Sequence, residues 1–230
     1  MHPFARHPLL HNAPLCTRRR PKHIATECPR VRFRYALSLP ALAEALAFCK
    51  GAGVPITVHA GELPRGMISN LKAAMELPVA RIGHGVGLAY GDAAETGEAA
   101  ALLQQAARSG VVVEACLTAN LTRSRVTSYA AHPIRQMADA GLAVTLNVDN
   151  LTLSGDPEYA AAYPLHGELS YAYPSGELAH LVADCGFSWA EARTLLLAGA
   201  KAAFAADAGF VAEFTDGLDA ILIEEGLELA

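Results

Sequence analysis

Four short apolar segments recur along the chain, and each is followed by a helical segment or a long connection. Their ends lie roughly 30 residues apart, which is the length of a strand, a helix and their loops. We expect strands at Val54–Val58, Ala80–Ile82, Val111–Cys116 and Leu142–Asn147. Strands joined in this way pair in parallel with the helices outside, and near-continuous apolar strands are buried on both faces. The pattern predicts an α/β fold with four βα units, either half of a (β/α)8 barrel or a small open sheet.

Before and between these strands, apolar residues recur at the spacing of a helix. The predicted helices are Pro40–Gly51, Ile68–Glu76, Ala93–Ser109 and Ile134–Ala140. After residue 150 the pattern becomes helical, with helices expected at Gly176–Ala183, Trp189–Ala198 and Ala200–Ala206. Ser188 is a suitable N-cap for the second of these, because its hydroxyl can accept a hydrogen bond from a free helix amide.

Composition narrows the classes of partner. A chain of 230 residues is long enough for one domain with a real core. No stretch approaches the roughly 20 apolar residues of a membrane helix. The net charge of −5 argues against a nucleic-acid partner. Five widely spaced cysteines without a CxxC pair predict a reduced, cytoplasmic setting. We therefore expect neither a nucleic-acid partner nor a membrane.

The first 34 residues differ from the rest of the chain. Residues 1–34 hold eight of the 18 Lys and Arg residues and one acidic residue, Glu27. We predict that residues 1–34 are disordered or poorly folded and that residues 35–230 form the folded half barrel. A targeting or nucleic-acid role for the basic run Arg18–Lys22 is the alternative.

Polar side chains follow the predicted strands. His59 and Glu62 follow the first, His84 the second, and Asp149 the fourth, while the third continues through Glu114 towards Asn120. In parallel α/β folds, sites are built at the carboxyl ends of strands. Imidazole and carboxylate groups are suitable Zn²⁺ ligands, and zinc lowers the pKa of a bound water to about 7. A nearby carboxylate can transfer protons.

Four motifs in this order resemble the adenosine deaminase family, over about residues 35–215. They are His59-Ala60-Gly61-Glu62, Gly83-His84-Gly85, Glu114-Ala115-Cys116 with Asn120, and Asn147-Val148-Asp149-Asn150. The resemblance implies a zinc-dependent hydrolase that deaminates adenosine or a related 6-aminopurine, with a small-molecule purine substrate as its partner.

The resemblance also assigns a role to each matching residue. His59 and Asp149 would be zinc ligands, and Asp149 would also accept a proton from the attacking water. Glu62 would protonate the purine at N1, and His84 would orient the attacking oxygen. Gly61 and Asn150 would bind the substrate, with Asn150 near the purine N7, where the family more often has Asp.

Two departures from the family leave alternatives open. The family supplies two further zinc ligands from a His-x-His pair, and this chain contains no His-x-His. Its first four βα units have no counterpart here. A non-catalytic remnant is therefore one alternative, and another amidohydrolase-type metal hydrolase is a second. A half barrel has unpaired strand edges, so we also expect self-association.

Each of these residues also has an ordinary structural interpretation. His59 alone fits a hydrogen-bonded core or loop histidine, and Glu62 fits the first turn of a helix. Asp149 and Asn150 fit a turn. Glu114 and Cys116 are interpreted as structural residues. The remaining histidines of the folded region are expected at the surface or in loops: His132, His166 and His180.

Overall fold

The computed structural model describes residues 43–64, 66–89, 96–124, 126–149 and 173–227. The chain divides into two units, Met1–Arg32 and Phe33–Ala230, and all the described residues belong to the second. The predictions for residues 1–34, Asn150 and His166 therefore lie outside the described residues.

A four-stranded parallel sheet organises the described region. Its strands are β1 (Thr57–Ala60), β2 (Arg81–His84), β3 (Val112–Ala115) and β4 (Ala143–Leu146), and they pair in the order β1-β2-β3-β4. All three pairings are parallel. The predicted α/β architecture with four βα strands is thus confirmed.

The first strand begins later than predicted. β1 starts at Thr57 rather than Val54 and continues to Ala60. Pro55 explains part of this difference, because proline has no backbone N–H to donate to a strand ladder. The paired strand therefore includes His59 itself, which lies opposite Gly83 of β2.

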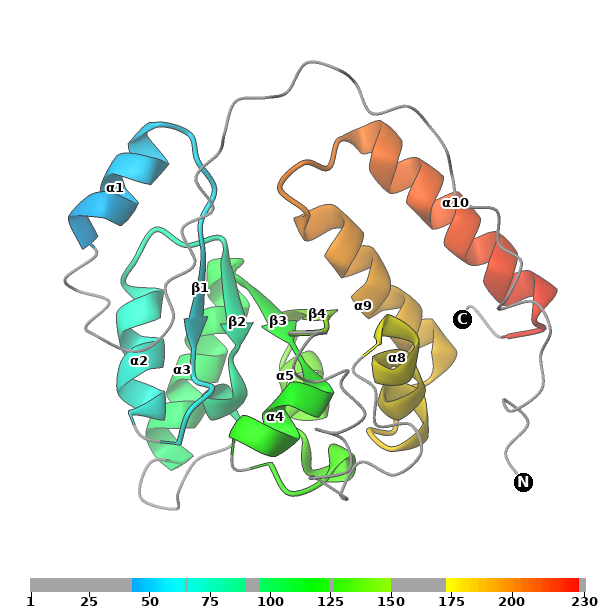
Figure 1. Ribbon diagram of the computed structural model, residues 1–230, viewed down its shortest axis with the longest axis horizontal. Helices are drawn as coiled ribbons and strands as arrows, with labels where there is room; N and C mark the ends of the chain where they lie inside the picture. The colour runs from blue at the N-terminus through cyan, green and yellow to red at the C-terminus, as the bar shows by residue number, and fades with distance from the viewer. Residues whose placement is uncertain (1–42, 65, 90–95, 125, 150–172, 228–230) are drawn as a thin grey trace. The chain divides into compact units, whose positions relative to one another are not determined.

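One helix precedes the first strand, and further helices follow the strands and continue to the C-terminal region (Figure 1). They are α1 (Ala43–Gly51), α2 (Met67–Met75), α3 (Thr96–Ser109), α4 (Leu117–Arg123), α5 (Ile134–Asp139), α8 (Pro174–Ala183), α9 (Trp189–Ala202) and α10 (Ala208–Glu224), with short 3-10 turns η4 (Val86–Leu88) and η5 (Tyr129–Ala131). Ser188 caps α9 as predicted, in a capping box with Glu191. The separate helix predicted at Ala200–Ala206 is wrong, because α9 continues to Ala202 and ends where Ala203 is extended. The sequence prediction also missed α4 and α10.

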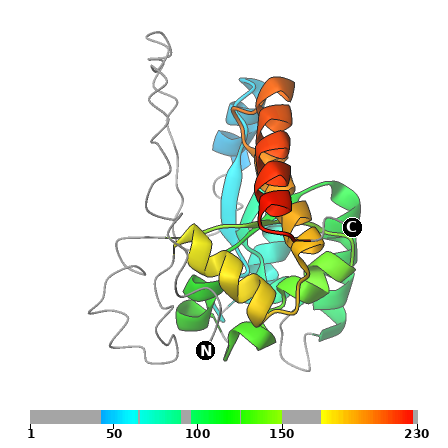
Figure 2. The ribbon, with the colours of Figure 1, turned by 90° about the vertical axis from the view of Figure 1, so that its right-hand side faces the viewer.

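The helices pack directly on the strands. α2 contacts β1, while α5 and α9 contact β4, and α10 packs along α9 (Figure 2). Leu71, Ile82 and Val113 are fully buried in the resulting core. Full burial of such a side chain contributes about 1.5–3 kcal/mol. In the sheet as described, β1 and β4 are the outer strands. Among the described residues, no helix has the length and apolar character to cross a membrane.

Candidate metal and proton-transfer site

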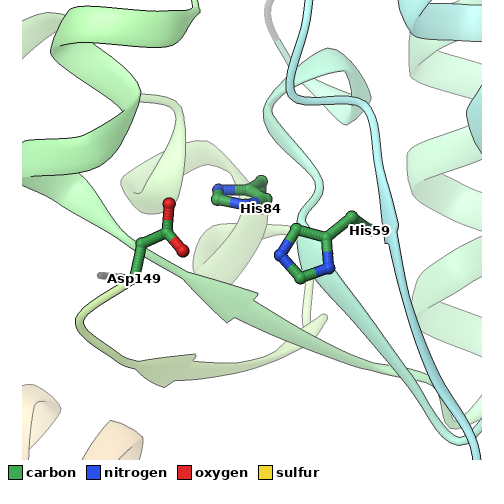
Figure 3. A group of neighbouring side chains, drawn as sticks. All are labelled: His59, His84 and Asp149. Atoms are coloured by element: carbon green, nitrogen blue, oxygen red, sulfur yellow. The ribbon is translucent and has the colours of Figure 1, made fainter. Parts of the chain in front are cut away.

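Three side chains meet at the carboxyl end of the sheet (Figure 3). His59 comes from β1, His84 is the last residue of β2, and Asp149 follows β4. One donor atom from each lies within 4.8 Å of the others. His84 is buried, Asp149 is half-buried and His59 is exposed. The structure thus brings together three residues that are far apart in sequence, as the strand pattern predicted.

Two residues in the left-handed backbone region shape this end of the sheet. Gly61 has φ +70°, and a Cβ there would lie 2.8 Å from the Leu71 side chain, so no larger residue fits. The Gly61 carbonyl accepts a hydrogen bond from Gly87 N. A substrate-binding role for Gly61 stays a prediction. His84 has φ +69°, which costs a non-glycine residue roughly 1–2 kcal/mol.

Glu62 lies beside His84, with 3.6 Å between Glu62 Oε2 and His84 Nε2. Its side chain is 12% exposed. The backbone of Glu62 is held in place, because Ser124 Oγ donates a 2.7 Å hydrogen bond to its carbonyl. A carboxylate at this position is close enough to the strand ends to exchange a proton with a molecule bound there, and this role of Glu62 stays a prediction.

Arg123 extends the site in a way the sequence analysis missed. Its Nη1 lies 3.2 Å from Asp149 Oδ2 and 3.8 Å from Glu62 Oε1. The guanidinium therefore offsets the repulsion between two nearby carboxylates. No sequence signal pointed to Arg123, because it is carried by α4, which the sequence pattern did not predict.

The start of α4 is held by a distant carboxylate. Glu177 on α8 accepts hydrogen bonds from the backbone N–H groups of Leu117 (2.7 Å) and Thr118 (3.1 Å). These are amides that a helix start leaves without partners. Burial raises the pKa of Glu177, and the hydrogen bonds from Thr118 and Leu117 oppose that effect. Glu177 thereby fixes the helix that carries Asn120 and Arg123.

His84 is also held from behind by buried polar groups. Its Nδ1 lies 3.0 Å from Asn120 Nδ2, and Asn120 Oδ1 lies 3.0 Å from His132 Nε2. His132 lies between η5 and α5, in a loop as one of the two expectations had it, but it is not at the surface, since only 4% of it is exposed. His180 is likewise buried, and its ring stacks on Tyr129. Both rings are covered by tertiary packing that the local sequence does not reveal.

Burial keeps both imidazoles of this network uncharged near neutral pH. Desolvation, followed by the charge of His84, lowers the pKa of His132 to about 3. The pKa of His84 is lowered to about 4 by desolvation first and then by the charge of His59; Asp149 acts in the opposite direction.

Glu114 and Cys116 have structural surroundings, as interpreted from the sequence. Glu114 accepts hydrogen bonds from Thr57 Oγ1 at 2.9 Å and from Arg81 Nε. These contacts join the first three strands below the site. Burial raises the pKa of the Cys116 thiol well above its usual value, so this cysteine is a poor nucleophile.

The donor set fits a divalent metal such as zinc. Zinc is held by imidazole nitrogen and carboxylate oxygen at about 2.0–2.2 Å, and His59 and Asp149 offer one donor of each kind at the same end of the sheet. Asp149 Oδ2 is buried and accepts no hydrogen bond from the described residues, although Arg123 lies near it. An oxygen with a free lone pair at this position is suited to a metal ligand.

Comparison with known proteins identifies the family of the chain. The model of the adenosine deaminase family matches residues 35–219. The chain belongs to the adenosine deaminase family. An adenosine deaminase from Erwinia tasmaniensis is 37% identical over 121 residues, which cover 51% of this chain and 34% of that protein. The chain therefore spans about a third of the length of this relative.

Solved structures of an adenine deaminase and of an amidohydrolase match the fold. An adenine deaminase from Arthrobacter aurescens superposes with a TM-score of 0.61 at 25% identity, over 80% of this chain and 49% of that one. An amidohydrolase from Burkhoderia ambifaria with bound Zn gives 0.59 at 26% identity, over 84% and 49%. The four-stranded sheet thus corresponds to about half of a (β/α)8 barrel, as predicted.

Proposed function

We propose that this chain carries the proton-transfer groups and part of the metal ligands of a zinc-dependent deaminase acting on adenosine or a related 6-aminopurine. One observation carries the proposal: His59, His84 and Asp149 converge within 4.8 Å, and Glu62 lies 3.6 Å from His84. Membership of the adenosine deaminase family and the zinc-bound relative support it.

Each side chain has a part in the proposed reaction. His59 and Asp149 hold the ion, which when bound supplies the Lewis acidity that makes water nucleophilic near neutral pH. Glu62 delivers a proton to the purine N1 and so makes C6 electrophilic. His84 donates a hydrogen bond to the attacking oxygen, and Asp149 accepts the proton that the water loses. The C6–N bond then breaks, and the amino group takes up this proton and leaves as ammonia. Asn150, outside the described residues, contacts N7, and Gly61 approaches the base through its backbone.

The activity assay is direct. We expect the purified chain with zinc to release ammonia and inosine from adenosine, and to lose this activity with a chelator. Glu62→Gln should reduce the rate about 10²–10⁴-fold, the usual contribution of a general acid–base group. Glu98→Gln is the matched control, because Glu98 is an exposed residue on α3 that pairs with Lys72. A folded, zinc-loaded chain that deaminates no aminopurine contradicts the proposal.

A non-catalytic role is the second candidate, because the 230 residues contain no His-x-His pair. Catalytic zinc normally has three protein ligands, and His59 with Asp149 makes two. Metal analysis separates the two candidates. Stoichiometric zinc in the purified protein contradicts the non-catalytic role, and zinc-free protein with an intact fold supports it. Activity on a non-purine amidine, without activity on aminopurines, would instead identify another amidohydrolase reaction.

A further inference from the structure

A buried line of hydrogen bonds leads from the backbone of α5 to His84. The Ile134 N–H donates to His132 Nδ1 at 3.1 Å. His132 Nε2 lies 3.0 Å from Asn120 Oδ1, and Asn120 Nδ2 lies 3.0 Å from His84 Nδ1. The three side chains are at most 4% exposed. Their hydrogen bonds are therefore made with one another rather than with water.

The hydrogen bond between Ile134 N–H and His132 Nδ1 determines which atom is the donor in each of the other hydrogen bonds. A backbone N–H can only donate, so His132 Nδ1 must be the acceptor. A neutral imidazole has one protonated nitrogen, and the proton of His132 is therefore on Nε2. The low pKa of His132, about 3, agrees with a neutral ring. His132 consequently donates to Asn120.

The donation by His132 determines how the side-chain amide of Asn120 is oriented. Its Oδ1 accepts from His132, so its amide nitrogen faces His84 Nδ1 and also lies 3.5 Å from Ser124 Oγ. An amide turned the other way would place its NH2 group against the N–H of His132. An amide nitrogen can only donate, so His84 Nδ1 accepts, and the proton of the neutral His84 ring is on Nε2.

We propose that Asn120 and His132 are positioning residues that hold His84 as its Nε2–H tautomer, which makes His84 a hydrogen-bond donor towards the site rather than a third metal ligand. Its Nε2 faces Glu62 Oε2 at 3.6 Å. A protonated nitrogen has no lone pair to give to a metal. His59 and Asp149 are then the ligands of the three-donor cluster.

The inferred tautomer also explains the role expected for His84, which is to orient the attacking oxygen. A donor is the group that can stabilise negative charge on an attacking oxygen. The use of this proton in deamination rests on the proposed function. The tautomer itself rests only on the hydrogen bonds, so it can be measured whether or not the chain is active.

The test is nitrogen NMR at neutral pH on the full chain carrying ¹⁵N-histidine, without metal. The signals of His84 are those absent from His84→Gln. We expect a pyrrole-type signal for Nε2 and a pyridine-type signal for Nδ1. A pyrrole-type Nδ1 signal in the wild-type chain overturns the proposal, and this measurement needs no other variant to fold.

Two variants distinguish a positioning role of Asn120 and His132 from a purely structural role. Asn120→Asp replaces the donor with an acceptor, so the pyridine-type Nδ1 signal of His84 should be lost. His132→Gln keeps a donor towards Asn120 Oδ1, so the His84 pattern should be retained. A purely structural role would leave the tautomer unchanged in Asn120→Asp, and that result overturns the proposal. A changed tautomer in His132→Gln overturns the part assigned to His132.

Discussion

The two sides of the candidate site are built differently. On the inner side, His84, Asn120 and His132 are buried and joined by hydrogen bonds of 3.0 Å. On the outer side, Arg123 lies between the carboxylates of Glu62 and Asp149.

The difference concerns what fixes each side. When one partner of a buried hydrogen bond is removed, the desolvation cost of the other group is no longer offset, so the fold holds the inner side in place. On the outer side, the side chains of Arg123, Glu62 and Asp149 are 12–22% exposed, so water reaches part of each charged group and the outer side can adapt to what binds there. The fold thus presets the hydrogen-bond donor His84, while the arrangement of the charged groups on the outer side depends on the bound ion.

Breaking the inner side should have the largest effect. Asn120→Leu leaves a ring nitrogen of His84 and one of His132 without a partner, and each such group costs about 1–3 kcal/mol. We expect the free energy of unfolding in urea to fall by about 2–5 kcal/mol. Gln104→Leu, at an exposed position of α3, is the control and should change it by less than about 0.5 kcal/mol. Equal stabilities for the two variants would remove the distinction between the two sides.

The stability of the chain should fall at low pH because the folded state keeps His132 uncharged. Its pKa is about 3 in the folded chain and 6.5 in the unfolded chain. Between these values the unfolded state binds the proton and the folded state does not, so stability is full above pH 6.5 and is lost as pH falls towards 3. From pH 7 to pH 5, the free energy of unfolding of the wild-type chain should fall by about 2 kcal/mol more than that of His132→Gln, since one pH unit corresponds to about 1.4 kcal/mol. Urea unfolding at both pH values measures this, and parallel losses would contradict it.

On the outer side, Arg123 competes with a metal for Asp149. Arg123→Ala removes a cation 3.2 Å from the carboxylate and should tighten zinc binding about fivefold to tenfold, or about 1 kcal/mol. Titration calorimetry with zinc measures the affinity. Arg123→Lys keeps the charge and should stay near the wild-type value. Weaker binding in the alanine variant would instead show that Arg123 supports the site.

The smallest effect on stability is expected at His59. Its side chain is exposed, so His59→Ala should change the free energy of unfolding by less than about 0.5 kcal/mol. The same variant should lose zinc binding in calorimetry. A loss of stability above 1 kcal/mol would place His59 with the inner side.

The sequence was sufficient for the sheet and for the residues at its carboxyl end. Apolar strand segments are local signals, and the carboxyl ends of parallel strands meet at one edge. His59, Glu62, His84 and Asp149 could therefore be grouped before their distances were known.

The inner side could not be predicted in the same way. α4 has no side-chain cap of its own at Cys116, because Glu177, which lies 60 residues along the chain from Leu117, binds its first amides. Without α4, neither the inward position of Asn120 nor the reach of Arg123 could be inferred. The burial of His132 likewise depends on packing between elements distant in sequence.

The contact between Glu177 and the start of α4 has a consequence for protein engineering. A chimera with a related half barrel that joins the two parents between residues 124 and 173 would take α4 from one parent and α8 from the other. If the second parent had no carboxylate at position 177, the amides of Leu117 and Thr118 would lose their acceptor. Recombination libraries should therefore inherit residues 117–177 as a single block.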